Sequence, residues 1–369
     1  MSLLKKAIVL STSLVALYVA IVIGLCFETP QTLMIYLHWL QAPLYAKFDT
    51  PEYYGFAHNA IRNIQIKTED NITLGAWHIL PSEYHIEQKL NIMDQVTNDI
   101  FDQALMDVKY DTVIYFHGNA MNRVAPWRID LYKNLRMKFP KLNILALDYR
   151  GFGDSEGSPS EYGLQLDAQA TYNWLLSKKV SHDRISLIGH SLGTGVATTL
   201  AHDLSRKGTP PKTLILQAPY TSLSHLVFEY RLLEYIPILG PLKWSSFAKE
   251  LMLSRLNHRF DSLSRISKVS CPILIVVGQH DIEIPVDHST QLFYEALIGK
   301  DDDWLTKKKN EIQVYEIKNE AKVYIKKSSD KSSSLVELVY LEHANHNNLG
   351  YFDYLYTAIG DVTHWTSNM

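Results

Sequence analysis

Apolar residues in the middle of the chain form short continuous runs that alternate with stretches of helical periodicity. The runs are rich in Val, Ile and Leu and occupy residues 112–116, 144–147, 185–188, 214–217, 273–277 and 336–341. Helix-like stretches lie between them, for example at 160–177 and 193–206. Continuous apolar strands joined by helices are typical of a mostly parallel central sheet with helices on both faces. The pattern therefore predicts an α/β fold that binds its ligand at the carboxyl ends of the strands.

Four other segments depart from this alternation. Alternating residues at 64–68 and 73–79 predict a β-hairpin. Residues 82–110 are polar with scattered apolar positions and predict a surface insertion with a short helix. Residues 220–268, rich in Leu, Tyr, Phe and Trp, predict a helical cap over the site. Residues 300–334 are dominated by Lys, Asp, Glu and Ser, and predict a solvated insertion between the last two strands.

The first part of the chain, residues 1–28, predicts a transmembrane anchor. Residues 7–27 carry no charge and, as a helix rising about 1.5 Å per residue, would cross a hydrocarbon core of about 30 Å. Lys5 and Lys6 precede this run, so the positive-inside rule places the N-terminus in the cytoplasm and the rest of the chain across the membrane. A cleaved signal peptide is the alternative, but the run is longer than the usual apolar core of such a peptide and no Ala-x-Ala site follows.

Residues 29–60 form the expected linker between this anchor and a domain that spans residues 61–369. An apolar stretch within the linker, residues 33–46, is short and interrupted by Pro43. It can be an interfacial membrane helix or a linker packed on the domain, and the sequence favours neither. Asn71 begins an Asn-Ile-Thr glycosylation sequon at the expected turn of the hairpin, where a glycan could be attached across the membrane.

Composition excludes several classes of protein. Hydrophobic residues make up 46% of the chain and charged residues 20%, which excludes a disordered chain. A net charge of -3 without a long basic stripe speaks against nucleic-acid binding. Two cysteines cannot build a disulfide framework, and no Cys/His cluster has the spacing of a zinc site.

A candidate nucleophile lies in the segment Gly189–Gly193, which reads GHSLG and matches G-x-S-x-G between an expected strand and an expected helix. This context lifts the serine above the sheet on a tight turn, so Ser191 is the predicted nucleophile. The backbone N–H of Leu192 begins the helix and would face negative charge that develops during a reaction. The N–H of Asn119, in the His-Gly-Asn turn after an earlier strand, is the natural second oxyanion donor. His190 is expected to face away and pack.

A serine hydroxyl needs a base, and the base needs an orienting carboxylate. The chain order of this arrangement is serine, acid, histidine. We predict Asp281 as the acid because it stands just past a strand end, with Glu283 and Asp287 as rivals. Asp148 and Asp154 precede the serine, so we expect them to form turns that brace the site.

The predicted base is His346, which follows the last strand. His343 is its rival, but its place nearer the strand favours a packed or surface histidine.

These motifs resemble those of α/β-hydrolase serine hydrolases and, more narrowly, of the membrane-anchored abhydrolase-domain lysophosphatidylserine and monoacylglycerol lipases. The resemblance rests on YFHGNA (115–120), LDYRGFGDSEGSPSE (147–161), IGHSLGTGVAT (188–198), TPPKTLILQAPYTS (209–222), SCPILIV (270–276) and HNNLGY (346–351). It implies the α/β-hydrolase fold, with Ser191, Asp281 and His346 as the catalytic triad. It also implies an oxyanion hole formed by Asn119 and Leu192.

The resemblance implies a lipase that cleaves the acyl ester of a lysophospholipid or monoacylglycerol through an acyl-enzyme, without a metal or organic cofactor. The catalytic domain would lie on the lumenal side of a single-pass membrane anchor, which we place in the endoplasmic reticulum. One alternative is a protein depalmitoylase or other thioesterase. Cytosolic enzymes of that kind commonly carry an N-terminal cysteine cluster, whereas this chain has only Cys26 there. A non-catalytic lipid-binding protein is a further alternative, although it would not need all three triad residues.

Overall fold

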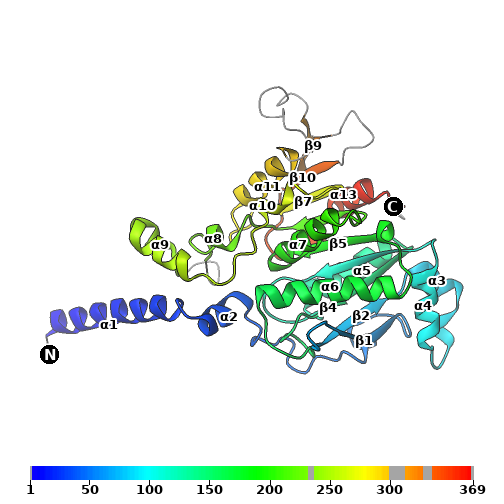
Figure 1. The fold of residues 1–369 in the computed structure, drawn as a ribbon, viewed down its shortest axis with the longest axis horizontal. Coiled ribbons are helices and arrows are strands. Elements are labelled where there is room, and N and C mark those ends of the chain that lie inside the picture. The colour runs from blue at the N-terminus through cyan, green and yellow to red at the C-terminus, as the bar shows by residue number, and fades with distance from the viewer. Residues whose placement is uncertain (1, 232–236, 299–311, 327–334, 367–369) are drawn as a thin grey trace.

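The computed structural model describes residues 2–231, 237–298, 312–326 and 335–366, and within them one ten-stranded sheet (Figure 1). The spatial order of the strands is β1-β2-β4-β3-β5-β6-β7-β10-β9-β8. Neighbours from β4 to β10 are parallel, and the pairs at the two ends are antiparallel. The predicted mostly parallel sheet is confirmed. The strands are β1 (Ile61–Lys67), β2 (Thr73–Ile79), β3 (Asp111–Phe116), β4 (Leu142–Leu147), β5 (Ile185–His190), β6 (Leu214–Gln217), β7 (Ile273–Gly278), β8 (Gln313–Ile317), β9 (Ala321–Lys326) and β10 (Val336–Leu341).

Helices cover both faces of this sheet. Along β3, Ile114 contributes to one hydrophobic core, whereas Val113 and Tyr115 contribute to the other, because successive side chains of a strand point to opposite faces. Both faces of the sheet are therefore shielded from water, which explains why the central strands are apolar at nearly every position. The first core is covered by α6 (Glu161–Ser177), α7 (Leu192–Arg206) and α11 (Val286–Ile298), and the second by α5 (Pro126–Lys138) and α13 (Asp353–Thr363).

Two predicted insertions contain more regular structure than their composition indicates. The segment 82–110 forms two helices, α3 (Ser82–Glu87) and α4 (Asn98–Met106), which share a small core of their own. The segment 300–334 is not a plain solvated insertion, because β8 and β9 lie within it and extend the sheet beyond β10. Val323 of β9 is fully buried, so this charged segment still packs one apolar face. Residues 299–311 and 327–334 lie outside the described residues.

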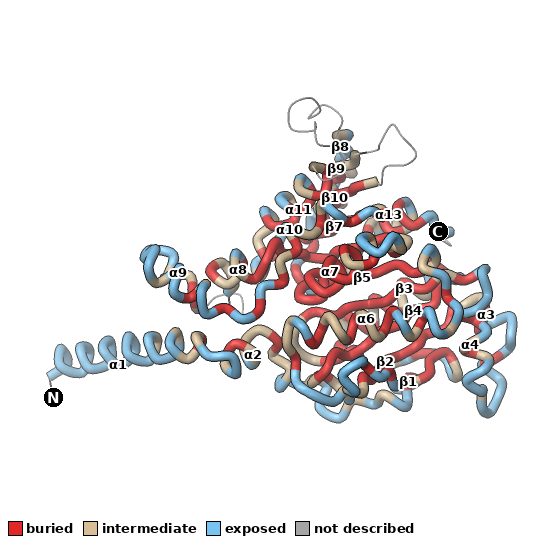
Figure 2. Tube along the Cα trace, in the orientation of Figure 1, coloured by how far each residue is buried: buried red, intermediate tan, exposed pale blue. Residues whose placement is uncertain are grey.

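The N-terminal helix α1 (Leu3–Gly24) projects from the body of the protein, and none of its residues is buried (Figures 1 and 2). It begins earlier than the predicted run at 7–27, and the Ser2 side chain caps its start by accepting from the Lys5 N–H at 3.4 Å. It also ends earlier, at Gly24. By length and composition α1 is long and apolar enough to cross a membrane. This finding agrees with the predicted anchor.

The linker begins with a second helix, α2 (Glu28–Tyr36), which packs on the domain. The Tyr36 side chain is fully buried in the first core. The Gln31 side chain is also buried, and its Nε2 donates to the carbonyls of Leu25 at 2.9 Å and Arg255 at 2.7 Å. Within the segment 33–46, Tyr36 therefore packs on the domain, whereas Leu33, Trp39, Leu40 and Leu44 are exposed.

The predicted cap at 220–268 contains helices that are joined by irregular segments in the part that the structure describes. Its helices are α8 (Leu223–Leu226), the 3-10 helix η4 (Gly240–Trp244), α9 (Ser246–Arg255) and α10 (Leu263–Ile266), and residues 232–236 lie outside the described residues. Leu239 and Met252 of this cap form a buried cluster with Leu25 at the end of the anchor helix. The cap and the anchor therefore meet on the same side of the protein (Figure 1).

Candidate active site

Ser191 occupies the turn between β5 and α7 in a strained backbone conformation. Its φ is 50° and its ψ is -120°, a region that residues with a side chain rarely adopt. Two glycines make the turn possible. A Cβ on Gly189 would lie 2.5 Å from the Gly193 carbonyl oxygen, and one on Gly193 would lie 2.0 Å from the Phe116 carbonyl oxygen. The sequence G-x-S-x-G is thus needed here because β5, α7 and the end of β3 approach too closely for side chains.

The two predicted oxyanion donors lie on either side of this serine. Leu192 is the first residue of α7, so its N–H has no partner within the helix. Asn119 follows β3, and a Cβ on the preceding Gly118 would lie 3.2 Å from the Ser191 Cβ. The loop that carries Asn119 is therefore in close contact with the turn that carries Ser191.

A buried arginine holds the Asn119 loop in place. The Arg128 guanidinium donates to the carbonyls of Gly118 at 3.2 Å, Asn119 at 3.3 Å and Ala120 at 3.1 Å. Arg128 is 1% exposed, so this charge is solvated by backbone carbonyls instead of water. This residue could not be predicted from the sequence, because an arginine in a helix of mixed composition gives no sign that it points inward.

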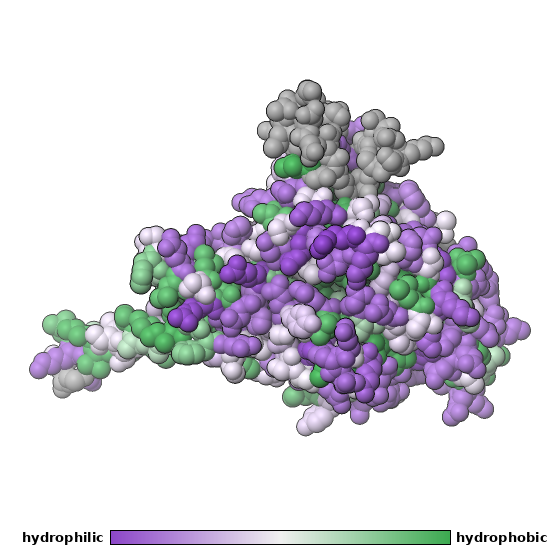
Figure 3. All heavy atoms as spheres, in the orientation of Figure 1, coloured by the Kyte–Doolittle hydropathy of each residue, from purple (hydrophilic) through white to green (hydrophobic). Residues whose placement is uncertain are grey.

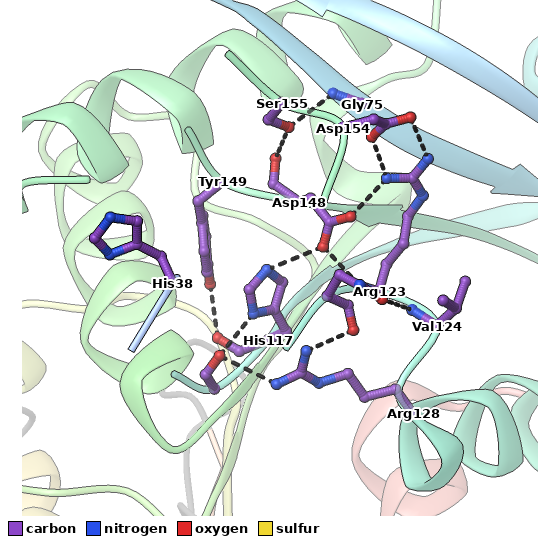
Figure 4. Close-up of polar contacts among 12 residues, drawn as sticks. His38, Gly75, His117, Arg123, Val124, Arg128, Asp148, Tyr149, Asp154 and Ser155 are labelled. Atoms are coloured by element: carbon purple, nitrogen blue, oxygen red, sulfur yellow. Dashed lines mark hydrogen bonds and ion pairs between the residues drawn. The ribbon is translucent and has the colours of Figure 1, made fainter. Parts of the chain in front are cut away.

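A second buried network braces the start of the same loop. Arg123 pairs with Asp148 at 2.6 Å and with Asp154 at 2.6 Å, and its backbone N–H also donates to Asp148 at 2.6 Å (Figure 4). Burial disfavours the Asp148 carboxylate, but Arg123 and His117 outweigh burial and hold its pKa below the ordinary value. The expectation that Asp148 and Asp154 brace the site agrees with these contacts.

The linker supports the loop from the outside. The N–H groups of Ala120 and Met121 donate to the carbonyls of Tyr36 at 2.8 Å and Leu40 at 2.9 Å. Ala120 and Met121 both have positive φ, at 59° and 57°, so these external bonds stabilise a conformation that such residues disfavour. The anchor-proximal linker is therefore part of the scaffold of the site.

Asp281 and His346 lie in hydrogen-bond contact. His346 Nδ1 is 2.8 Å from one Asp281 carboxylate oxygen, and the other oxygen accepts from the N–H groups of Glu283 at 3.0 Å and Ile284 at 2.9 Å. The rivals Asp287 and His343 are exposed. Burial works against the protonated form of His346, but the carboxylates of Asp281 and Glu283 outweigh it and raise its pKa above the ordinary value.

Ser191 and His346 line the same cavity. Within the described residues, however, no hydrogen bond joins the Ser191 hydroxyl to the His346 ring, whose Nε2 lies 3.8 Å from a Glu283 oxygen. Such bonds are often long before a substrate binds. His190, predicted only to pack, also contacts this group, since its Nε2 lies 2.9 Å from the His346 carbonyl oxygen.

Two cavities of different character meet at Ser191. The first is apolar and is lined mainly by the cap and the linker, including Leu25, Leu226 and Met252. The second is more polar and includes His346 and Glu283. Ser191 and Asn119 line both cavities. In the described part of the chain, no group of three or more His, Cys, Asp or Glu residues could hold a metal ion.

A strained serine between a buried parallel strand and a helix, with an Asp–His pair in later loops, defines the class of α/β-hydrolase-fold proteins. Residues 111–250 match the family model described as alpha/beta hydrolase fold. Among solved structures, the chain is similar to the Pyrococcus furiosus esterase Pf2001, with a TM-score of 0.55 and 19% identity, covering 88% of this chain and 99% of that one. At this level of identity the likeness shows the fold alone.

Curated relatives narrow the class. The chain is 30% identical over 289 residues to lysophosphatidylserine lipase ABHD12 from Danio rerio, covering 78% of this chain and 72% of the relative. It is 33% identical over 266 residues to protein ABHD12B from Homo sapiens, covering 71% of this chain and 68% of the relative. The chain therefore belongs to the ABHD12 family of α/β-hydrolase-fold proteins. The predicted fold class and family resemblance are confirmed.

Proposed function

We propose that this protein is a serine esterase that cleaves the acyl ester of a lysophospholipid through an acyl-enzyme. The observation that carries this proposal is the position of Ser191 at the junction of an apolar and a polar cavity. A lipid with one acyl chain would place that chain in the apolar cavity, its head group in the polar cavity and its ester at the serine. The name lysophosphatidylserine lipase, carried by several relatives, supports the same substrate class.

The first half of the reaction forms the acyl-enzyme. His346 Nε2 takes the Ser191 proton as the hydroxyl oxygen attacks the ester carbonyl. Asp281 accepts from Nδ1–H at 2.8 Å, which fixes the tautomer and stabilises the imidazolium. The N–H groups of Asn119 and Leu192 stabilise the oxyanion, and losing one such donor typically costs about 10²–10³ in turnover.

The second half releases the products. His346 gives its proton to the glycerol oxygen, which leaves with the head group as the carbonyl re-forms. A water molecule then attacks the acyl-enzyme, with His346 again accepting a proton, and the fatty acid leaves as the Ser191 oxygen is reprotonated. Every proton in this scheme passes through His346.

We further propose that α1 anchors the protein in the endoplasmic reticulum membrane, with the catalytic domain in the lumen. The two lysines before the apolar run support this orientation. The burial of Leu25 against the cap supports retention of the segment, because cleavage after the apolar run would remove that contact. Asn71 is exposed at the turn between β1 and β2, with φ 65°. An endoglycosidase-sensitive mass shift that disappears in Asn71→Gln would support the orientation, and an unglycosylated, protease-accessible domain in sealed vesicles would contradict it.

The decisive experiment for the reaction is a substrate panel with the full chain in detergent or vesicles. It compares lysophosphatidylserine, a monoacylglycerol and an acyl-thioester peptide, using the wild type and Ser191→Ala. We expect fatty-acid release from the lysophospholipid, and loss of both hydrolysis and fluorophosphonate labelling in Ser191→Ala while the protein remains folded.

Each of the other possible results of this panel would support a different function. Preferred hydrolysis of the monoacylglycerol would move the substrate class to neutral glycerolipids, and preferred hydrolysis of the thioester would favour a depalmitoylase. Retained labelling in Ser191→Ala would defeat the assignment of the nucleophile. Lack of any acyl-enzyme signal in the wild type would favour a lipid-binding protein.

A further inference from the structure

Exposed aromatic and aliphatic side chains gather where the anchor helix meets the cap. Those near the end of the anchor helix and those of the cap together define what we name the anchor-side patch. Figure 3 shows apolar residues along α1 and, mixed with polar ones, on the neighbouring cap. Its anchor and linker members are Phe27, Leu33, Trp39, Leu40 and Leu44, and its cap members are Trp244, Phe247 and Leu251. Trp244 is 91% exposed and Phe247 is 75% exposed. Apolar patches of this kind on a protein surface mark interaction sites.

The cap half of this patch lies at the start of α9. Phe247 and Leu251 are four residues apart on α9, so they share one face of that helix. Trp244 ends the preceding 3-10 helix η4, and Ser245 joins the two elements in an extended conformation. Met252, on another face, is 2% exposed and packs against Leu25. The segment therefore already uses one face for the fold, and its exposed apolar face has no structural role within the described residues.

The two halves of the patch are joined by direct contacts. The Gln31 side chain donates to the Arg255 carbonyl at 2.7 Å and accepts from the Asn257 N–H at 3.0 Å. Leu25 packs in the cluster that contains Met252. Because Gln31 is 2% exposed, these bonds are shielded from water, and the linker and the end of α9 are held together.

The patch surrounds the elements that line the apolar cavity. Leu25 and Met34 from the anchor side, and Leu239 and Met252 from the cap, line that cavity, which reaches Ser191. The end of the anchor helix, the linker and the cap thus carry apolar residues on two sides. One side faces the cavity, and the other side is exposed at the protein surface.

A lipid bilayer is the occupant that fits this surface. The patch is continuous with α1, which is long and apolar enough to cross a membrane and has no buried residue. It contains two exposed tryptophans, Trp39 and Trp244, and exposed tryptophans with nearby lysines are typical of the membrane interface. Lys249 lies on α9 itself, with its Nζ 5.8 Å from the Phe228 ring.

We propose that the anchor-side patch docks onto the bilayer beside α1 and holds the apolar cavity open toward the lipid. The acyl chain then passes from the membrane to Ser191 without crossing water. This inference rests on the proposed membrane anchoring and on the proposed reaction. It adds a second membrane contact, on the cap, that the anchor alone does not supply.

The test uses the full chain in phosphatidylcholine vesicles and a matched pair of double variants. Trp244→Ser with Phe247→Ser removes the cap half of the patch. The control is Ile86→Ser with Val108→Ser, which removes two side chains that are 70% and 83% exposed near α3 and α4, at the other end of the protein (Figure 1). Each variant is assayed on lysophosphatidylserine in the vesicles and on a water-soluble short-chain ester.

We expect the cap variant to lose about tenfold or more of its rate on the vesicle substrate, because two large apolar side chains no longer enter the membrane. Its rate on the soluble ester, and both rates of the control variant, should stay within about twofold of the wild type. No selective loss on the vesicle substrate, or an equal loss on both substrates, would overturn the proposal.

A second readout does not depend on hydrolysis. Brominated lipids should quench the fluorescence of wild-type protein more than that of Trp244→Phe, and equal quenching would overturn the docking. If quenching differs as expected but the wild type hydrolyses no ester, the proposed reaction fails while the docking stands. If the cap variant instead converts a dimer into a monomer and leaves quenching unchanged, the patch is a protein interface and the proposal is wrong.

Discussion

His190 Nε2 lies 2.9 Å from the backbone carbonyl oxygen of His346. Since a carbonyl only accepts, Nε2 of His190 carries the proton and donates. Burial lowers the pKa of His190 to about 3, so the ring is neutral at ordinary pH. The residue before the nucleophile thus holds the loop that carries the proposed base, and the two rings lie 5.1 Å apart. His190 is a positioning residue in this arrangement.

Replacing His190 tests this role. His190→Ala should lower kcat about tenfold with little change in KM, because a buried hydrogen bond worth about 1 kcal/mol is lost and the base is held less firmly. His190→Gln keeps a donor and should recover part of the rate. Steady-state kinetics on a soluble ester, with thermal unfolding as the control, measure both. If Gln is as damaging as Ala at equal stability, the hydrogen bond is not the cause.

Glu283 should set the acid side of the pH profile. His346 must be neutral to act as a base, and the Glu283 carboxylate helps to raise its pKa. Glu283→Gln removes that charge, which favours the neutral ring, so the rising limb of kcat/KM should move to lower pH. The control is Asp287→Asn, which removes an exposed carboxylate nearby. An unchanged limb in Glu283→Gln, or an equal shift in both variants, would contradict this account.

Much of the fold could be predicted because its signals are local. The strands that carry Ser191, Asp281 and His346 are apolar at nearly every position, and each of these residues follows a strand end. Sequence order alone therefore placed Asp281 and His346 near each other, and the structure has them in hydrogen-bond contact. Their roles as acid and base stay predictions.

Other features could not be predicted because they depend on contacts between distant segments. The bond from the Ala120 N–H to the Tyr36 carbonyl joins two backbones, and backbone pairing across a long separation leaves no pattern in either segment. The strands β8 and β9 were hidden by their lysines and glutamates. The alternation of apolar and polar residues around Val323 and Ile325 indicated a strand. We gave more weight to the charged composition of the segment and therefore did not predict it.

The Arg123–Asp148 pair should contribute strongly to stability. Both side chains are fully buried, so Arg123→Met leaves a carboxylate without its cation and should cost about 3–5 kcal/mol of unfolding free energy. Adding Asp148→Asn removes the unpaired buried carboxylate and should recover part of the lost unfolding free energy. Urea denaturation of the full chain in detergent measures the double variant and both single variants, Arg123→Met and Asp148→Asn. If the double variant is as unstable as the sum of the single ones, the pair does not interact as the contacts indicate.

The same pair should make stability depend on pH. The pKa of Asp148 is held below its ordinary value in the folded protein, so its contribution is present above the unfolded pKa and is lost as pH falls through the folded pKa. Stability measured from neutral to acidic pH should therefore fall less steeply in the double variant Arg123→Met with Asp148→Asn than in the wild type. Equal slopes would show that Asp148 does not carry this dependence.

Gly193→Ala should reverse the usual effect of alanine in a helix. At an ordinary helix position this change stabilises a protein by up to about 1 kcal/mol. At Gly193 the new Cβ would lie 2.0 Å from the Phe116 carbonyl oxygen, a backbone atom, so the turn that carries Ser191 must shift. We expect fluorophosphonate labelling to fall by about 10² or more, because the serine and the oxyanion donors lose their alignment.

Gly24→Ala is the matched control, since a Cβ there meets nothing within 4 Å, and it should label like the wild type. Far-ultraviolet circular dichroism separates a displaced turn from an unfolded chain, and full labelling of a folded Gly193→Ala variant would show that the close approach of α7 to β3 is not required.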